Sequence, residues 1–239
     1  MTRVMLCGSY EPSDIKMLVE EGAHGIGLIT EVRQKLPCRL SLEQARGLRR
    51  LIPPLVTSIL IITEEQAERV IFMAKEVNPD AVQLHGFNAV EQVAFLKRKL
   101  KTAIIKTLHW MEKGLAEGAD PERCAREYVE AGADAILLDT MTAEKVGSTG
   151  LQFPLEVARR IRKAIYPSPL ILAGGLNKNN IKNALATVQP FAVDAFSAVT
   201  TAGRLERKKV ICFLRAVMDL PAKYHADASA AKGNNRNDR

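Results

Sequence analysis

Two side chains that could transfer protons stand at the ends of apolar runs. Cys7 ends the run VMLC (residues 4–7), and Asp139 ends the run AILLD (135–139). A thiol and a carboxyl group that face each other across a site could act as a base and an acid. This chemistry needs a thiol pKa below its ordinary value of about 8.5 and a carboxyl pKa above about 3.9. Burial would raise the carboxyl pKa, and a helix N-terminus or nearby cations would lower the thiol pKa.

Short apolar runs alternate with amphipathic segments along the chain. The runs are rich in Val, Ile and Leu without strict alternation, which is typical of parallel strands buried on both faces. The apolar runs are 4–7, 25–29, 55–62, 81–85, 103–108, 135–139, 169–174 and 193–199. The amphipathic segments are 13–22, 41–52, 63–77, 89–100, 120–132, 154–165, 178–188 and 206–220. Eight strands alternating with eight helices predict an α/β protein, a single (β/α)8 TIM barrel.

Local signals support several of these helices. Ser41 precedes Gln44 and Thr63 precedes Gln66 by three residues, the spacing of a capping box. Gly22 stands where a helix C-terminal cap belongs. Residues 1–220 therefore form the predicted barrel, and the small and polar residues 221–239 form a predicted disordered C-terminal tail.

Composition limits the classes of partner. The 239 residues are 47% hydrophobic and carry a formal charge of +7, but the cations are scattered over predicted helices. Aromatic residues make up only 5%, too few for an obvious base-stacking surface, so we expect a small anionic substrate and no nucleic acid.

The cysteines and the N-terminus bear on metal, membrane and compartment. The four cysteines form no CxxC pair and no cluster with zinc spacing, so we expect no metal site. The N-terminal residues lack the apolar stretch of a signal peptide, and no run is long enough to span a membrane. These features predict a cytoplasmic protein with no membrane partner. The oligomeric state stays open between a monomer and a homodimer.

A barrel carries its active site at the C-terminal ends of its strands. Gly174 and Gly175 follow the seventh predicted strand, and Ser197 and Ala198 fall at the end of the eighth. Small residues let the backbone N–H groups approach an anion closely, and barrels commonly bind phosphate after these two strands. The sequence therefore predicts a phosphate site built by these four residues.

The strand ends resemble those of the phosphoribosylanthranilate isomerase family of tryptophan biosynthesis. The similar stretches are LCG (6–8), VQLHG (82–86), AILLDT (135–140), GSTG (147–150), LAGGLNKNN (172–180) and VDAFSAV (193–199). The resemblance implies a cofactor-free Amadori rearrangement of N-(5-phosphoribosyl)anthranilate. It also implies that Cys7 is the base that removes the sugar C2 proton and that Asp139 is the acid that opens the furanose ring. Gln83 and His85 would line the substrate pocket.

The sequence departs from the family pattern in the parts that hold the substrate. The family's arginine for the anthranilate carboxylate aligns with Cys38, so Arg39, one residue on, or Arg33 would replace it. Ser148 and Ala198 stand where the family has glycine, and Phe196 stands where it has serine. Two alternatives therefore stay open: a divergent paralogue acting on another aminosugar phosphate, and a barrel that binds a phosphorylated ligand without turnover.

Overall fold

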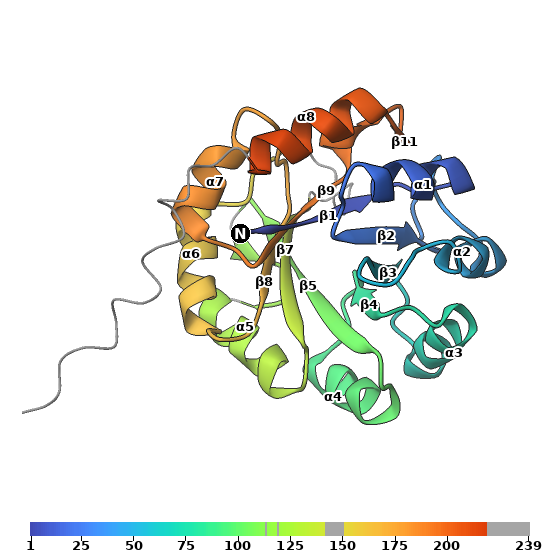
Figure 1. Ribbon diagram of the computed structural model, residues 1–239. Helices are drawn as coiled ribbons and strands as arrows, with labels where there is room; N and C mark the ends of the chain where they lie inside the picture. The colour runs from blue at the N-terminus through green and yellow to red at the C-terminus, as the bar shows by residue number, and fades with distance from the viewer. Residues whose placement is uncertain (113, 119, 142–150, 219–239) are drawn as a thin grey trace, which may run out of the picture.

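Eight parallel strands close into a barrel with helices around it (Figure 1). The structure is a computed structural model that describes residues 1–112, 114–118, 120–141 and 151–218. The predicted tail 221–239 and the GSTG stretch lie outside the described residues. Neighbouring strands follow the order β4-β3-β2-β1-β9-β8-β7-β5, and pairing of β4 with β5 closes the ring. The predicted (β/α)8 barrel is therefore confirmed.

The barrel strands are the Val-, Ile- and Leu-rich runs, each buried on both faces. They are β1 (Arg3–Cys7), β2 (Gly25–Ile29), β3 (Thr57–Ile62), β4 (Ala81–Leu84), β5 (Ala103–Met111), β7 (Ala135–Thr140), β8 (Leu170–Leu172) and β9 (Ala192–Ala195). A short strand β6 (Gly114–Leu115) folds back antiparallel onto the end of β5. A two-stranded ribbon, β10 (Thr200–Thr201) and β11 (Arg204–Leu205), follows β9.

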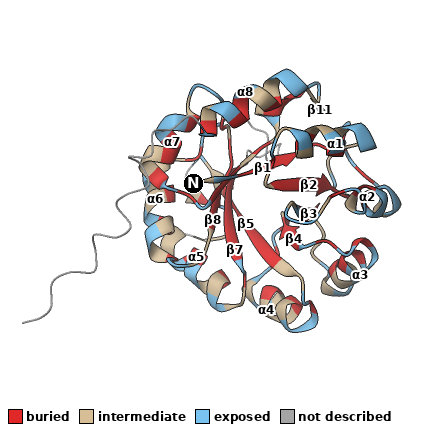
Figure 2. Ribbon diagram, viewed as in Figure 1, coloured by how far each residue is buried: buried red, intermediate tan, exposed pale blue. Residues whose placement is uncertain are grey.

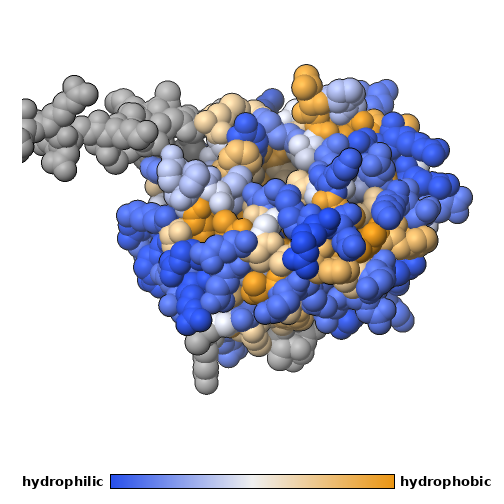
Figure 3. Space-filling view, turned by 90° about the horizontal axis from the view of Figure 1, so that it is seen from below, coloured by the Kyte–Doolittle hydropathy of each residue, from blue (hydrophilic) through white to orange (hydrophobic). Residues whose placement is uncertain are grey.

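The helices turn one apolar stripe toward the barrel and an exposed stripe toward solvent (Figure 2). They are α1 (Pro12–Glu20), α2 (Leu42–Arg49), α3 (Ala67–Val77), α4 (Val90–Lys99), α5 (Pro121–Glu130), α6 (Leu155–Ala164), α7 (Ile181–Val188) and α8 (Arg207–Met218). On the face shown in Figure 3, hydrophilic residues cover most of the surface and hydrophobic residues form small patches between them.

Two predicted boundaries are wrong. Thr63 and Gln66 form no capping box, because α3 begins at Ala67 and the Glu64 carboxylate instead accepts from the Glu65 and Gln66 backbone N–H groups. The eighth strand ends at Ala195 rather than at residue 199, and Ser197–Val199 form a 3-10 turn. By contrast, the Ser41 capping box is present, and Gly22 has the positive φ of a helix C-terminal cap.

Alternate residues of each strand point to the barrel axis. Most of the apolar side chains on the axis form one core cluster, which includes Met5, Cys7 and Ile61, while the larger cluster lies between the barrel and the helices. Gly27 of β2 leaves room for the Cys7 thiol, because a Cβ there would occupy the space of Cys7 Sγ and lie 2.7 Å from Ile61 Cδ1. The position of the thiol therefore depends on a glycine on the neighbouring strand.

We expect Gly27→Ala to lower the free energy of unfolding by about 1–3 kcal/mol, because the new methyl group forces Cys7 and Ile61 to shift. Gly47→Ala is the matched control, since Gly47 lies in α2 and a Cβ there meets no atom within 4 Å. That change should raise the free energy of unfolding by up to about 1 kcal/mol. Urea denaturation measures both; equal effects of the two substitutions would contradict the assignment of Gly27.

Candidate active site

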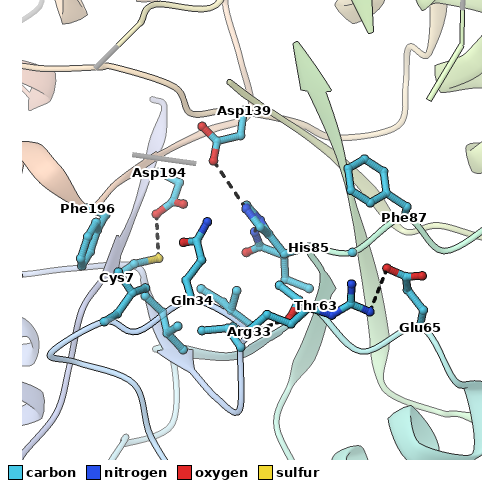
Figure 4. A pocket seen from close by; sticks show the side chains of 16 residues that line it. Cys7, Arg33, Gln34, Thr63, Glu65, His85, Phe87, Asp139, Asp194 and Phe196 are labelled. Atoms are coloured by element: carbon cyan, nitrogen blue, oxygen red, sulfur yellow. Dashed lines mark hydrogen bonds and ion pairs between the residues drawn. The ribbon is translucent and has the colours of Figure 1, made fainter. Parts of the chain in front are cut away.

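Cys7 and Asp194 form a hydrogen-bonded pair at the C-terminal mouth of the barrel (Figure 4). They lie on the adjacent strands β1 and β9, and Cys7 Sγ donates to Asp194 Oδ1 over 2.9 Å. Burial raises the pKa of the Cys7 thiol well above its ordinary value, and the charge of Asp194 and its hydrogen bond raise it further. The lowered thiol pKa that the acid–base chemistry needs is therefore not present in this structure, where the shift is upward.

Asp139 lies at the mouth on β7 and has the properties of an acid at neutral pH. Burial raises its pKa to about 7, a hydrogen bond from the Thr140 backbone N–H opposes that rise, and the charge of Asp194 adds to it. The pKa of Asp194 itself is raised to about 6 by burial, although the hydrogen bond from Cys7 lowers it. The expected upward shift at Asp139 is thus present, and a second buried carboxyl group accompanies it.

Gln83 and His85 of the β4 end line the same pocket. His85 Nε2 lies 3.7 Å from Asp139 Oδ2, and His85 Nδ1 lies 3.1 Å from Gln83 Nε2. Gln83 Nε2 also donates to Thr107 Oγ1 over 3.2 Å. Burial and the charges of His109 and Lys106 lower the pKa of His85 well below its ordinary value. His85 is therefore a neutral group facing the carboxyl of Asp139.

Two compartments meet at these groups. The larger has about 840 Å³ of empty space up to its open mouth, and its apolar lining includes Ile29, Val32 and Leu36. The smaller, about 340 Å³, is lined by Gly174, Gly175, Ser197 and their neighbours. Asp139, Asp194 and Phe196 line both compartments. Figure 4 shows Phe196 and Phe87 on opposite sides of the larger compartment, with Gln34 reaching between them.

Backbone geometry requires the glycine pair in the smaller compartment. Gly174 and Gly175 have φ of 75° and 66°, and a Cβ on Gly174 would lie 2.9 Å from Thr140 Cγ2. A Cβ on Gly175 would occupy the space of the Leu151 carbonyl. The Gly175 carbonyl accepts from Asn177 Nδ2 and Asn180 Nδ2, which hold the loop in place. This loop brings peptide backbone directly to the compartment wall.

The structure brings together most, but not all, of the residues that the sequence singled out. Ser197 lines the smaller compartment, whereas Ala198 lines a neighbouring groove beside Lys208. Ala198 belongs to the 3-10 turn without a positive φ, so its methyl group causes no backbone strain. Arg39 is exposed and does not line the larger compartment, whereas Arg33 does. Arg33 pairs with Glu65 across the rim at 3.6 Å (Figure 4).

Sequence reasoning missed two features of the site. The resemblance assigns no role to Asp194, although an aspartate in the last barrel strand, just before a predicted phosphate loop, is a signal for a mouth position. The sequence pattern indicates no carboxylate partner for His109, yet its Nδ1 lies 2.6 Å from Glu117 Oε1. That pairing depends on a hairpin that the strand pattern did not reveal.

Within the described ranges, no three His, Cys, Asp or Glu side chains are grouped to hold a metal ion. The same part of the chain contains no helix that is long and apolar enough to cross a bilayer.

The fold and the site define a (β/α)8 barrel with an acid–base centre between an apolar and a glycine-lined compartment. The family model "N-(5'phosphoribosyl)anthranilate (PRA) isomerase" matches residues 4–216. N-(5'-phosphoribosyl)anthranilate isomerase 1 of Methanosarcina mazei is 34% identical over 222 residues, which cover 90% of this chain and 94% of the relative. The chain therefore belongs to the PRA isomerase family.

Solved structures agree with this assignment. A PRA isomerase in complex with reduced 1-(o-carboxyphenylamino)-1-deoxyribulose 5-phosphate superposes with a TM-score of 0.72 at 27% identity. A structure described as monomers of the dimeric Thermotoga maritima isomerase gives the same TM-score at 26% identity. Each alignment covers 92% of this chain and 100% of the other.

The raised pKa of Asp139 predicts a stability cost that depends on pH. A folded-state pKa of about 7 lowers the stability of the protein as the pH rises from about 4 to about 7, because the unfolded state ionises this carboxyl group there while the folded state still holds the proton. We expect Asp139→Asn to be more stable than the wild type at pH 8, by on the order of 4 kcal/mol, and equal to it below about pH 4. Urea denaturation at a series of pH values measures the difference.

Asp80→Asn is the control with the opposite sign. Burial raises the pKa of Asp80, but hydrogen bonds from Ser58 and the charge of Arg49 outweigh burial and lower it overall. Its contribution to stability is present at neutral pH and is lost as the pH falls, so Asp80→Asn should be less stable than the wild type at pH 8. A wild-type stability that exceeds that of Asp139→Asn at pH 8 would contradict the assigned burial of Asp139.

Proposed function

We propose that the protein catalyses the Amadori rearrangement of N-(5-phosphoribosyl)anthranilate, an aldose–ketose isomerisation in tryptophan biosynthesis. One observation carries the proposal: Asp139 and Asp194 line both compartments. Asp194 also accepts the hydrogen bond from the Cys7 thiol. The substrate has an aryl group, a reacting ribose and a phosphate in the same order. The aryl group fits the apolar compartment and the phosphate fits the glycine-lined one.

In this proposal Asp139 is the general acid. At neutral pH its raised pKa leaves a large fraction of the carboxyl group protonated. It donates its proton to the furanose ring oxygen, the bond between C1 and that oxygen breaks, and the nitrogen lone pair forms an iminium group at C1. The positive iminium then makes the proton on C2 acidic, which prepares the second step.

Cys7 is the base of the second step, with Asp194 as its partner. The thiol proton passes to Asp194 along the 2.9 Å hydrogen bond, and the thiolate removes the proton from C2. The electron pair of the C2–H bond forms the C1=C2 double bond and neutralises the iminium, and the resulting enolamine tautomerises to the ketone. The high pKa of Cys7 without substrate keeps the thiol protonated until a cationic intermediate lies beside it.

The same proposal covers substrate binding and assembly. Gly174, Gly175 and Ser197 would bind the phosphate, with Ala198 supporting the 3-10 turn behind them. Gln83 and His85 would contact the sugar. The protein would act in the cytoplasm as a monomer or a homodimer, on a phosphorylated small molecule without a cofactor or nucleic acid.

The test generates N-(5-phosphoribosyl)anthranilate in situ and follows the loss of its fluorescence. We expect turnover by the wild type and losses of kcat of about 100-fold or more in Cys7→Ala, Asp139→Asn and Asp194→Asn, because each removes one proton-transfer group. Gly47→Ala serves as the control and should keep wild-type kcat. Folded wild type without turnover would reject this substrate; unchanged kcat in Asp194→Asn alone would reject the role of Asp194.

Arg33 and Arg39 give a second, separate prediction. Arg33 lines the larger compartment and Arg39 does not, so Arg33 is positioned to bind the anthranilate carboxylate after releasing Glu65. We expect Arg33→Ala to raise KM about tenfold with little change in kcat, and Arg39→Ala to leave both within about twofold. The reverse pattern would instead assign the carboxylate to Arg39 and require the 33–39 loop to rearrange on binding.

A further inference from the structure

A buried Glu–His pair lies behind the acid side of the site. The hairpin of β5 and β6 folds the chain back, and the Ala116 backbone N–H donates to the His109 carbonyl over 2.9 Å. Glu117 thereby reaches His109, where Oε2 accepts from the backbone N–H at 2.9 Å and Oε1 lies 2.6 Å from Nδ1. The His109 side chain is 0% exposed and that of Glu117 is 3% exposed. The proposed reaction assigns no role to this pair.

His109 connects the Glu117–His109 pair to His85 and Asp139, the two site residues that face each other. Its ring meets the His85 ring edge to face, with centroids 4.9 Å apart and planes at 89°. On the other side, His109 is the register partner of Asp139 on β7. An ionised carboxylate can accept hydrogen bonds but cannot donate them, so the contact with Glu117 Oε1 requires the proton to lie on His109 Nδ1. His109 Nε2 is buried without a hydrogen-bond partner among the described residues, so packing and Glu117 alone fix the ring.

We infer that Glu117 and His109 are positioning residues that keep His85 uncharged, with its proton on Nε2 facing Asp139. The inference rests on the proposed function, because its purpose is to preserve the proton on the general acid. A neutral His85 accepts from Gln83 Nε2 at Nδ1 and must then carry its own proton on Nε2, 3.7 Å from Asp139 Oδ2. A cationic His85 at that distance would favour the ionised carboxylate and remove the acid.

Charges around His85 support the neutral form. After burial, the charges of His109 and Lys106 lower the pKa of His85. Lys106 is fully buried outside the barrel, and its ammonium donates to the Gly86 and Thr107 carbonyls over 2.8 and 2.7 Å. It therefore also fixes the turn that follows His85. Among the described residues, the charged and titratable groups that face this region are His109, Lys106, Glu117, Arg33, Glu65, Asp139, Asp194 and Cys7.

The first test is a nitrogen-15 NMR spectrum of histidine-labelled wild-type protein at neutral pH, with His24→Gln, His85→Gln and His109→Gln used only to assign signals. We expect the His85 signals of a neutral ring protonated at Nε2, and a proton on His109 Nδ1. A cationic His85, or a neutral His85 protonated at Nδ1, would overturn the inference. This measurement needs no turnover, so it stands or falls independently of the proposed substrate.

The second test compares kcat–pH profiles of His109→Phe and Glu117→Gln. The first keeps a ring against His85 but removes the Nδ1–H donor, and the second keeps the shape of Glu117 but removes its charge. We expect each to lower kcat about tenfold, to keep KM within about twofold and to move the alkaline limb of kcat to lower pH. Glu112→Gln, an exposed change near the same hairpin, should match the wild type.

The outcomes of the second test separate a positioning role from a structural one. Folded His109→Phe and Glu117→Gln proteins with a wild-type kcat–pH profile would overturn the inference. A fall in kcat without a shift of the alkaline limb would also overturn it, because loss of packing alone gives that result. Should both variants unfold, the NMR spectrum of the wild type decides. A wild type without turnover rejects the proposed function, and the NMR result still tests the state of His85.

Discussion

The alternation of side chains in a closed parallel barrel is the constraint on which the site depends. Every second residue of a strand points to the axis, so the last inward residues of adjacent strands must meet at the mouth. This rule brings Cys7 of β1 to Asp194 of β9 and places His109 of β5 beside Asp139 of β7. A register shift of one residue on any of these strands would turn its functional side chain into the helix layer.

Burial at the mouth then sets the chemistry of these groups. The two carboxyl groups have pKa values of about 7 and about 6 because the barrel removes them from water, and the thiol pKa rises for the same reason. The consequence for Asp139 is a carboxyl group that holds a proton near neutral pH. The consequence for Cys7 is a thiol whose pKa lies well above its ordinary value and which donates its proton in a hydrogen bond to Asp194. Burial of these titratable groups therefore costs the fold stability once they ionise.

Glycine supplies the space in which this arrangement fits. Gly27 makes room for the Cys7 thiol, and Gly174 and Gly175 adopt positive φ where the backbone forms the wall of the smaller compartment. A large side chain also shapes the site: Phe196 lines both compartments. Its ring packs against Gly8, where a Cβ would lie 3.1 Å from the Phe196 ring. The walls of the two compartments therefore depend on side-chain volume as much as on charge.

The sequence by itself determined the barrel, because apolar runs and amphipathic segments alternate with local periods that need no tertiary information. It also placed Cys7, Gln83, His85 and Asp139 at strand ends, where a barrel gathers its functional groups. Only the tertiary structure paired Cys7 with Asp194 across 187 positions, separated Arg33 from Arg39, and folded Glu117 back to His109. These contacts depend on barrel closure, loop path and hairpin geometry, and burial, which shifts the pKa values, exists only once the strands have closed.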